Sequence, residues 1–272
     1  MPLCSALDGV RAKIARAQEH LKNVNSSIRS VLATKEKYPT PGYDYHPDSQ
    51  ELVIRMQKIT PLDRALPLAV GDCIHNARSA LDHLVFQLAI LNGAGSSAAS
   101  TTSFPVCLSA GALKKTVQHR IAPFISSAAL AEIEKRQPYA LGNAGRDDVL
   151  YVLAQLDNID KHRLLIVTAS KFRPVAFCVT LPNGDRFGHE ITHEKAREWK
   201  ATRDGAEIIR FDLSEVITEP GGVNVKLHTV AAVQIERTGL ICDGYVVQHI
   251  LSDCIQHVTN IVDEFGRMFF GE

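Results

Sequence analysis

The stretch TPLDRALPLAVGDCIHNARSALDHLVFQLAILNG, residues 60–93, decides the fold because it has the periodicity of one long amphipathic helix. Pro67 is compatible only with the first turn of such a helix, and Gly93 is typical of the position just after its end. Placing the residues at intervals of about 100° separates two faces. The apolar face consists of Ile74, Ala77, Leu81, Leu84, Val85 and Leu88. The polar face consists of Asp72, His75, Asn76, Ser79, Asp82 and His83, with Arg78 at its edge.

Helical periodicity recurs in three further segments, and the region before the last of them alternates like strands. We expect helices over about 5–37, 62–92, 145–168 and 243–270. We expect a small antiparallel sheet over about 172–238, with turns at Asn183-Gly184 and Gly221-Gly222. Residues 51–59, ELVIRMQKI, also alternate like a strand. The sequence therefore predicts a mainly α protein of the α+β class. It would be a single domain, 1–272, with a four-helix-bundle-like core and an inserted β-sheet.

Composition limits the classes of function. The 272 residues include 30 basic and 30 acidic side chains, so no net charge attracts the chain to nucleic acid or to anionic membrane. No apolar run has membrane-spanning length, and the first residues carry charge where a signal peptide needs an apolar run. The cysteines lack C-x-x-C spacing, and Cys73 and Cys254 lie in apolar helical patterns that are typical of a core. We expect a protein of the reducing cytoplasm.

The polar face of the 60–93 helix differs from an ordinary solvated surface. Residues 75–83, HNARSALDH, contain two histidines, an asparagine, an arginine and an aspartate, but no Lys or Glu. Phe86 continues the same face, where contact with water alone would not favour it. Because the apolar face is sufficient for folding, we interpret the polar face as part of a site. The alternative is a structural role, with Arg78 in a salt bridge to Asp82 or Asp160 and His83 buried between helices.

Two more polar clusters lie on the later helices. Residues 157–163, DNIDKHR, bring Asp160, Lys161 and His162 together, and Asp157 and Lys161 have the i,i+4 spacing of a surface ion pair. On the final helix His249, Asp253 and His257 follow one another at steps of four. We hypothesise that at least two of the three clusters share a pocket, with separate exposure to water as the alternative.

The segment Arg78-Ser79-Ala80-Leu81-Asp82-His83, on a helix of an expected bundle, resembles the R-x(4-6)-H signature of the HEPN superfamily. Many of these helical domains are metal-independent endoribonucleases, and Ser79 stands where the family usually has Asn, Asp or His. The resemblance implies RNA cleavage through the 2′-hydroxyl, without a cofactor, by a homodimer. Arg78 would stabilise the phosphate, His83 would transfer protons, and Asn76 would orient them. His75, Ser79, Asp82, Asp160, Lys161 and His162 would bind substrate. The helix followed by NIDKHR also resembles uncharacterised bacterial proteins, which implies no function.

Two other classes of function stay open. Asp72 and His75 have the i,i+3 spacing of metal sites in helical bundles, so a hydrolase or oxygenase with one divalent metal ion is an alternative. Its ligands would come from Asp72, His75, His249, Asp253 and His257. The third class is a non-catalytic binding or oligomerisation module whose polar face is an interface. Walker, G-x-G-x-x-G and G-x-S-x-G motifs are absent, so the sequence does not predict an NTPase, a Rossmann enzyme or a serine hydrolase of the elbow type.

Overall fold

The computed structural model describes residues 5–33, 41–56, 63–180, 184–190, 207–215, 224–236, 238–242 and 245–272. The chain divides into two compact units, and each is described by itself. The first unit comprises residues 1–26, 64–166 and 235–272, and the second comprises residues 27–63 and 167–234. The expected turn at Gly221-Gly222, Asn183 and residues 57–59 of the expected strand lie outside the described residues.

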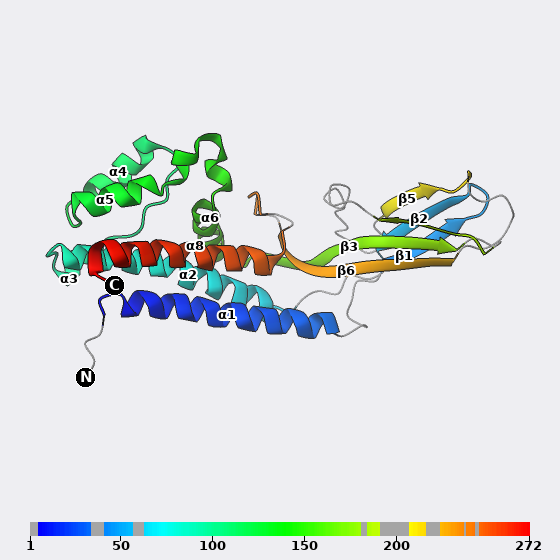
Figure 1. The fold of residues 1–272 in the computed structure, drawn as a ribbon, viewed down its shortest axis with the longest axis horizontal. Helices are drawn as coiled ribbons and strands as arrows, with labels where there is room; N and C mark the ends of the chain where they lie inside the picture. Colours follow the sequence, from blue (N-terminus) through cyan, green and yellow to red (C-terminus); the bar gives the residue numbers. More distant parts are fainter. Residues whose placement is uncertain are drawn as a thin grey trace. The chain divides into compact units, whose positions relative to one another are not determined.

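Four helices form the core of the first unit (Figure 1). They are α1 (Asp8–Ala33), α2 (Ala65–Leu91), α6 (Val149–His162) and α8 (Val247–Phe265). Helices α2, α6 and α8 contact one another. Helix α1 joins them through Arg11, which pairs with Asp263 of α8, and through the Ala17 carbonyl, which accepts a hydrogen bond from the Cys73 thiol of α2.

The predicted division of α2 into two faces is confirmed. Every residue of its expected apolar face is buried, and Cys73 and Ala80 are buried with them. The expected polar face is exposed or half-buried throughout. Pro67 lies in the first turn, as expected, and Gly93 follows the helix with a φ of 88°. Cys254 of α8 is also buried, as predicted for a core residue.

Short helices connect α2 to α6 within the first unit. They are α3 (Ser96–Ala99), α4 (Ala110–Arg120), α5 (Ser127–Lys135) and the 3-10 segment η2 (Pro138–Asp147). Ser109 and Ser126 cap α4 and α5, since each hydroxyl accepts a hydrogen bond from a backbone N–H of the first turn. The buried Gln137 side chain bonds the backbone of Cys107 and Pro105, which fixes the extended segment before α4. A π-helical turn, η3 (Gly266–Phe270), follows α8.

Helix α6 begins and ends at well-defined positions. Asp148 is its N-cap, and the carboxylate accepts hydrogen bonds from the backbone N–H groups of Leu150 and Tyr151. The helix ends at His162, and the prediction that it continues to about residue 168 is wrong. Arg163 adopts an extended conformation, and the chain continues as β3 from Ile166. The β-branched residues Ile166, Val167 and Thr168 explain this change, because such side chains favour strands.

The strands form two three-stranded sheets. The first has the order β1-β2-β5, from β1 (Pro41–His46), β2 (Glu51–Met56) and β5 (Glu207–Asp212). The second has the order β4-β3-β6, from β3 (Ile166–Thr180), β4 (Arg186–Glu190) and β6 (Asn224–Glu236). β1 pairs antiparallel with β2, β2 with β5, and β3 with β4. The predicted hairpin before and after residues 183–184 is confirmed, because Thr180 pairs with Arg186.

The fold is therefore α+β and mainly α, as the sequence predicts. The expected β region contributes β3 to β6, but β5 pairs with β2 from the early part of the chain. A strand far from 172–238 in sequence thus completes one of the sheets. Among the described residues, no helix is both long and apolar enough to cross a membrane.

The cap of α6 gives a first prediction. Asp148→Ala should lower the free energy of unfolding by about 1 kcal/mol, because two backbone N–H groups lose their acceptor. Urea denaturation followed by circular dichroism measures the change. Asp148→Ser keeps a capping oxygen and should recover most of the loss. Equal stability of the alanine variant and the parent would contradict the assigned cap.

Candidate functional site

The strongest candidate site lies where α2 and α6 meet, at His75 and Asp157. The His75 Nδ1 atom is 3.0 Å from Asp157 Oδ1. The Asp157 side chain is only 5% exposed, whereas the His75 side chain is 53% exposed. A carboxylate accepts hydrogen bonds, so Nδ1 carries the proton and the neutral imidazole presents the lone pair of Nε2. The pair is thus a proton acceptor that is open to solvent and is oriented by a buried carboxylate.

Two further side chains complete the contacts of this pair. Lys161 Nζ lies 2.5 Å from Asp157 Oδ2, so the buried carboxylate contacts a cationic side chain as well as the imidazole. On the other side of the imidazole, Ser79 Oγ lies 3.4 Å from His75 Nε2. Since Nε2 is the acceptor in this tautomer, the hydroxyl donates. We call His75, Ser79, Asp157, Asp160 and Lys161 the His75 site.

Asp160 is packed directly against the backbone of α2. An added Cβ at Gly71 would lie 2.5 Å from Asp160 Oδ2, so any other residue at this position would force the Asp160 carboxylate to move. Burial raises the pKa of the Asp160 carboxyl group, and the charges of Asp157 and Asp72 raise it further, while His75 lowers it. Asp160 therefore keeps its proton to a higher pH than an exposed aspartate does.

Arg78, predicted as catalytic, has structural contacts. Its Nη1 donates to Asp82 Oδ1 at 2.8 Å, and its Nη2 donates to the Phe104 carbonyl at 2.7 Å. Asp82 Oδ1 also accepts the Phe104 backbone N–H at 2.8 Å. The salt bridge with Asp82 is the structural alternative that the sequence allows for Arg78. Together the two side chains hold the backbone of the segment before α4 against α2, and the Arg78 side chain is only 13% exposed.

The other predicted residues of α2 and α6 are not brought into the His75 site. His83 is exposed rather than buried between helices, and it lies roughly 18 Å along the α2 axis from Gly71, where Asp160 sits. The Asn76 amide donates to the Asp72 carbonyl of its own helix at 2.8 Å. His162 is exposed at the last position of α6. The structure thus joins His75, Ser79, Asp160 and Lys161 of the predicted set, and leaves His83 and His162 apart.

The α8 cluster is also separate. His249 and Asp253 are exposed and His257 is half-buried. In the part of the chain that the structure describes, no three His, Cys, Asp or Glu side chains are placed to hold a metal ion together. The described structure therefore gives no support to the alternative that one metal ion is bound by Asp72, His75, His249, Asp253 and His257. The five cysteines among the described residues are free thiols.

The helical spacing of the α6 sequence could have shown that Asp157 is buried, although its spacing with Lys161 suggests a surface ion pair. Leu150, Leu153 and Asp157 follow one another at helical spacing, so Asp157 occupies a position of the buried face of α6. A charge at such a position indicates a specific partner on a neighbouring helix. The predicted ion pair between Asp157 and Lys161 is present. Its carboxylate is buried and its ammonium group is exposed, whereas the sequence predicts a pair on the surface.

Comparison of the chain with protein-family models, with curated proteins and with solved structures finds no match. The resemblance to the HEPN superfamily therefore rests on the residues of this chain alone.

The contacts of Arg78 predict a loss of stability on its removal. Arg78→Ala should lower the free energy of unfolding by about 1–3 kcal/mol, because the Phe104 carbonyl and Asp82 lose a partner in a part-buried location. Arg78→Lys should recover little, since an ammonium group does not reproduce the planar fork that reaches two acceptors. Denaturant unfolding tests both variants. A fully stable Arg78→Ala protein would show that the clamp is unimportant and would return Arg78 to the list of catalytic candidates.

Proposed function

We propose that this protein is a metal-independent endoribonuclease in which His75, and not His83, is the general base. The observation that carries the proposal is the His75–Asp157 pair, with one ring nitrogen bound to a buried carboxylate and the other directed to a hydroxyl. This is the arrangement that a base needs in order to abstract a proton from an alcohol. RNA is the substrate class that the HEPN resemblance of this helix implies, and the proposal keeps it although Arg78 and His83, the two residues of the motif, take no part in the proposed chemistry. The resemblance also supports a homodimer, and scattered free cysteines support a cytoplasmic location.

In the proposed reaction, His75 Nε2 takes the proton of a ribose 2′-hydroxyl. The 2′-oxygen attacks the adjacent phosphorus, the bond to the 5′-oxygen breaks, and a 2′,3′-cyclic phosphate forms. The leaving 5′-oxygen needs a proton, and Asp160 is the best donor of the site because burial and neighbouring carboxylates raise its pKa. Lys161, about half exposed, supplies positive charge beside the base.

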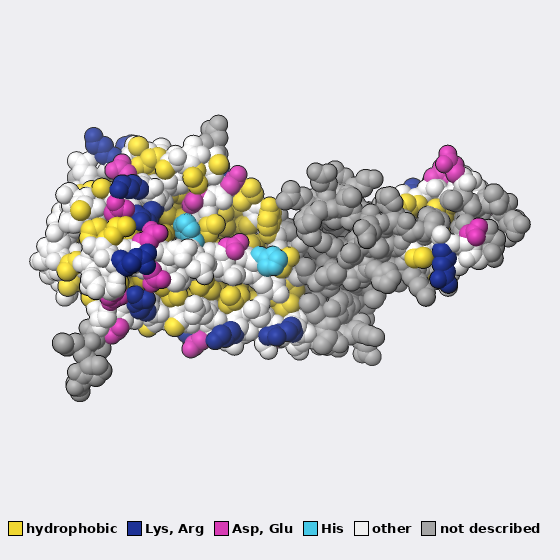
Figure 2. Space-filling view, viewed as in Figure 1, with side chains coloured by type: hydrophobic (Ala, Val, Ile, Leu, Met, Phe, Trp, Pro, Cys, Tyr) yellow, Lys and Arg dark blue, Asp and Glu magenta, His cyan; other side chains and the backbone are white. Residues whose placement is uncertain are grey.

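Electrostatics restrict how RNA would bind. On the face seen in Figure 2, the basic and acidic side chains of the described residues intermingle, and neither sign forms a broad patch. Long polyanions bind mainly through many phosphate contacts, so we expect weak overall affinity and recognition of a short segment at the site.

The proposal predicts a specific pattern of variants. His75→Ala should slow the cleavage of mixed-sequence RNA by about 10²–10⁴-fold in the presence of a chelator, because the base is lost. Asp157→Asn should also slow it, since the imidazole loses its fixed tautomer. His83→Ala, an exposed histidine on the same helix, is the matched control and should cleave like the parent. Gel analysis of the RNA and detection of the cyclic phosphate give the readout.

Three results would contradict this proposal. They are intact RNA with the parent protein, equal cleavage of the 2′-deoxy substrate, and loss of activity in His83→Ala with full activity in His75→Ala. Circular dichroism of each variant separates loss of chemistry from loss of fold.

A second candidate function is supported by the Ser79 contact. Ser79, His75 and Asp157 form a hydroxyl–imidazole–carboxylate series, with distances of 3.4 and 3.0 Å between successive members. Such a series activates a serine nucleophile. Ser79 Oγ would attack an ester carbonyl while His75 takes its proton, and the protonated imidazole would then donate that proton to the leaving alkoxide. Water would release the acyl group from Ser79 by the reverse use of the same imidazole.

Experiments on Ser79 distinguish the two candidate functions, the ribonuclease and the serine esterase. If Ser79 is a nucleophile, a fluorophosphonate probe should label the parent but not Ser79→Ala, and p-nitrophenyl acetate hydrolysis should fall to the level of His75→Ala. Intact-mass spectrometry locates the adduct. If the hydroxyl only neighbours the base, Ser79→Ala should keep RNA cleavage, and no adduct should form in the parent.

A further inference from the structure

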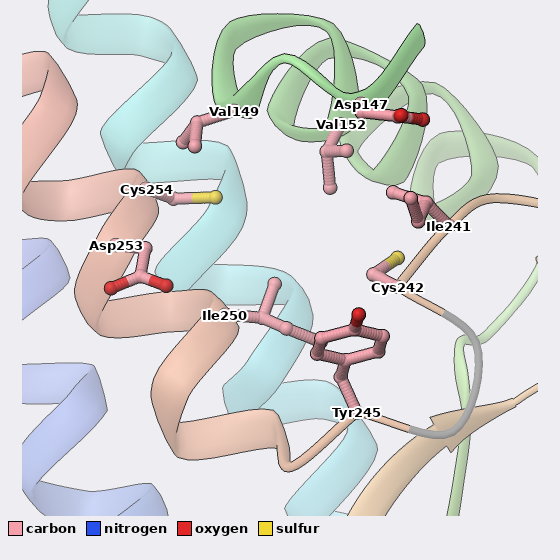
Figure 3. A pocket seen from close by; sticks show the side chains of 9 residues that line it. All are labelled: Asp147, Val149, Val152, Ile241, Cys242, Tyr245, Ile250, Asp253 and Cys254. Atoms are coloured by element: carbon pink, nitrogen blue, oxygen red, sulfur yellow. The ribbon is translucent and has the colours of Figure 1, made fainter. Parts of the chain in front are cut away.

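A pocket lies within the first unit, among α6, α8 and the residues Ile241, Cys242 and Tyr245 (Figure 3). Its cavity volume is about 180 Å³, so it admits only a small ligand. Its lining includes Val152 of α6, Ile250 of α8, and Cys242. It uses residues near the start of α6, whereas the His75 site uses residues of the last turns, so the pocket goes beyond the proposed function.

The walls of the pocket are apolar and chemically unreactive. Val152, Ile250, Cys242 and Cys254 are each at most 7% exposed. Burial strongly raises the pKa of the Cys254 thiol, so it stays protonated and acts as a wall atom instead of a nucleophile. The Tyr245 ring covers one side, and its hydroxyl points toward the interior of the pocket (Figure 3). These walls suit an apolar body rather than a sugar or a phosphate.

The rim of the pocket carries negative charge. Asp147, at the end of η2, and Asp253, on α8, are exposed lining residues on different sides (Figure 3). Among the described residues, neither carboxylate has a Lys, Arg or His within ion-pair distance. Two uncompensated carboxylates beside apolar walls attract a cation and repel an anion.

We propose that this pocket binds a small organic cation, an apolar or aromatic body that carries one ammonium group. The apolar body would replace water along Val152 and Ile250, and the ammonium group would lie at the mouth, near Asp253. An inorganic cation is a poorer match, because most of the lining cannot coordinate it.

Three probes of equal length test this assignment, 4-phenylbutylamine, 4-phenylbutanol and 4-phenylbutyrate, each titrated into the full-length protein by calorimetry. The amine should bind saturably, the alcohol about fivefold or more weakly, and the acid not at all, because an exposed charge pair contributes a factor of this order. Asp253→Asn should weaken amine binding by a similar factor and leave the alcohol unchanged. Asp48→Asn, an exposed aspartate of the β1–β2 turn, is the matched control and should bind like the parent.

Val152→Trp fills the apolar part and should abolish binding of both amine and alcohol, and a near-parental circular dichroism spectrum with cooperative unfolding verifies the fold. Val152 is buried, so its replacement can also affect folding. Tyr245 is exposed, and Tyr245→Ala should weaken the binding of both amine and alcohol without that risk. Equal affinity for all three probes, absence of saturable amine binding, or amine binding indifferent to Asp253→Asn would overturn the proposal. RNA cleavage by these variants is independent of the result, so failure here leaves the His75 assignment intact.

Discussion

The site depends on the close approach of α2 and α6 at Gly71. A side chain at this position would overlap the Asp160 carboxylate, so glycine allows this carboxylate to lie against the α2 backbone. His75 lies one turn further along α2 and Asp157 about one turn earlier on α6, and the same contact between the two helices brings them together. The hydrogen bond between them is therefore a consequence of helix packing and not of a flexible loop. A proton acceptor held by two packed helices keeps its orientation without further support.

Asp157 is the one charged residue in the buried set of the described chain. Removing a carboxylate from water costs several kcal/mol, and buried ion pairs often stabilise a fold no better than apolar residues do. Lys161 and His75 offset this cost from two directions, yet neither lies in the interior. An apolar residue at 157 would complete the α6 core face at lower cost. The carboxylate is thus better explained by the orientation that it imposes on His75 than by stability.

The sequence predicts the fold class and the two faces of α2, because both follow from periodicity within one segment. It also predicts that His75, Ser79, Asp160 and Lys161 belong together. For Arg78 the sequence leaves a catalytic role and a salt bridge with Asp82 open. The structure contains that salt bridge and adds the Phe104 carbonyl, and no side-chain pattern can reveal a backbone acceptor in an irregular segment. The pairing of β5 with β2 is equally hidden, since strand alternation specifies a face but not a distant partner.

The polar face of α2 therefore has two roles, which the composition of the face does not distinguish. Its first part, around Gly71 and His75, meets α6 and forms the His75 site. Its second part, Arg78 and Asp82, binds the Phe104 backbone and holds the segment that leads to α4. His75, Arg78 and Asp82 each have a fixed partner in these contacts. The absence of Lys and Glu from this face reflects those partners, and a site and a structural clamp on adjacent turns produce the same composition.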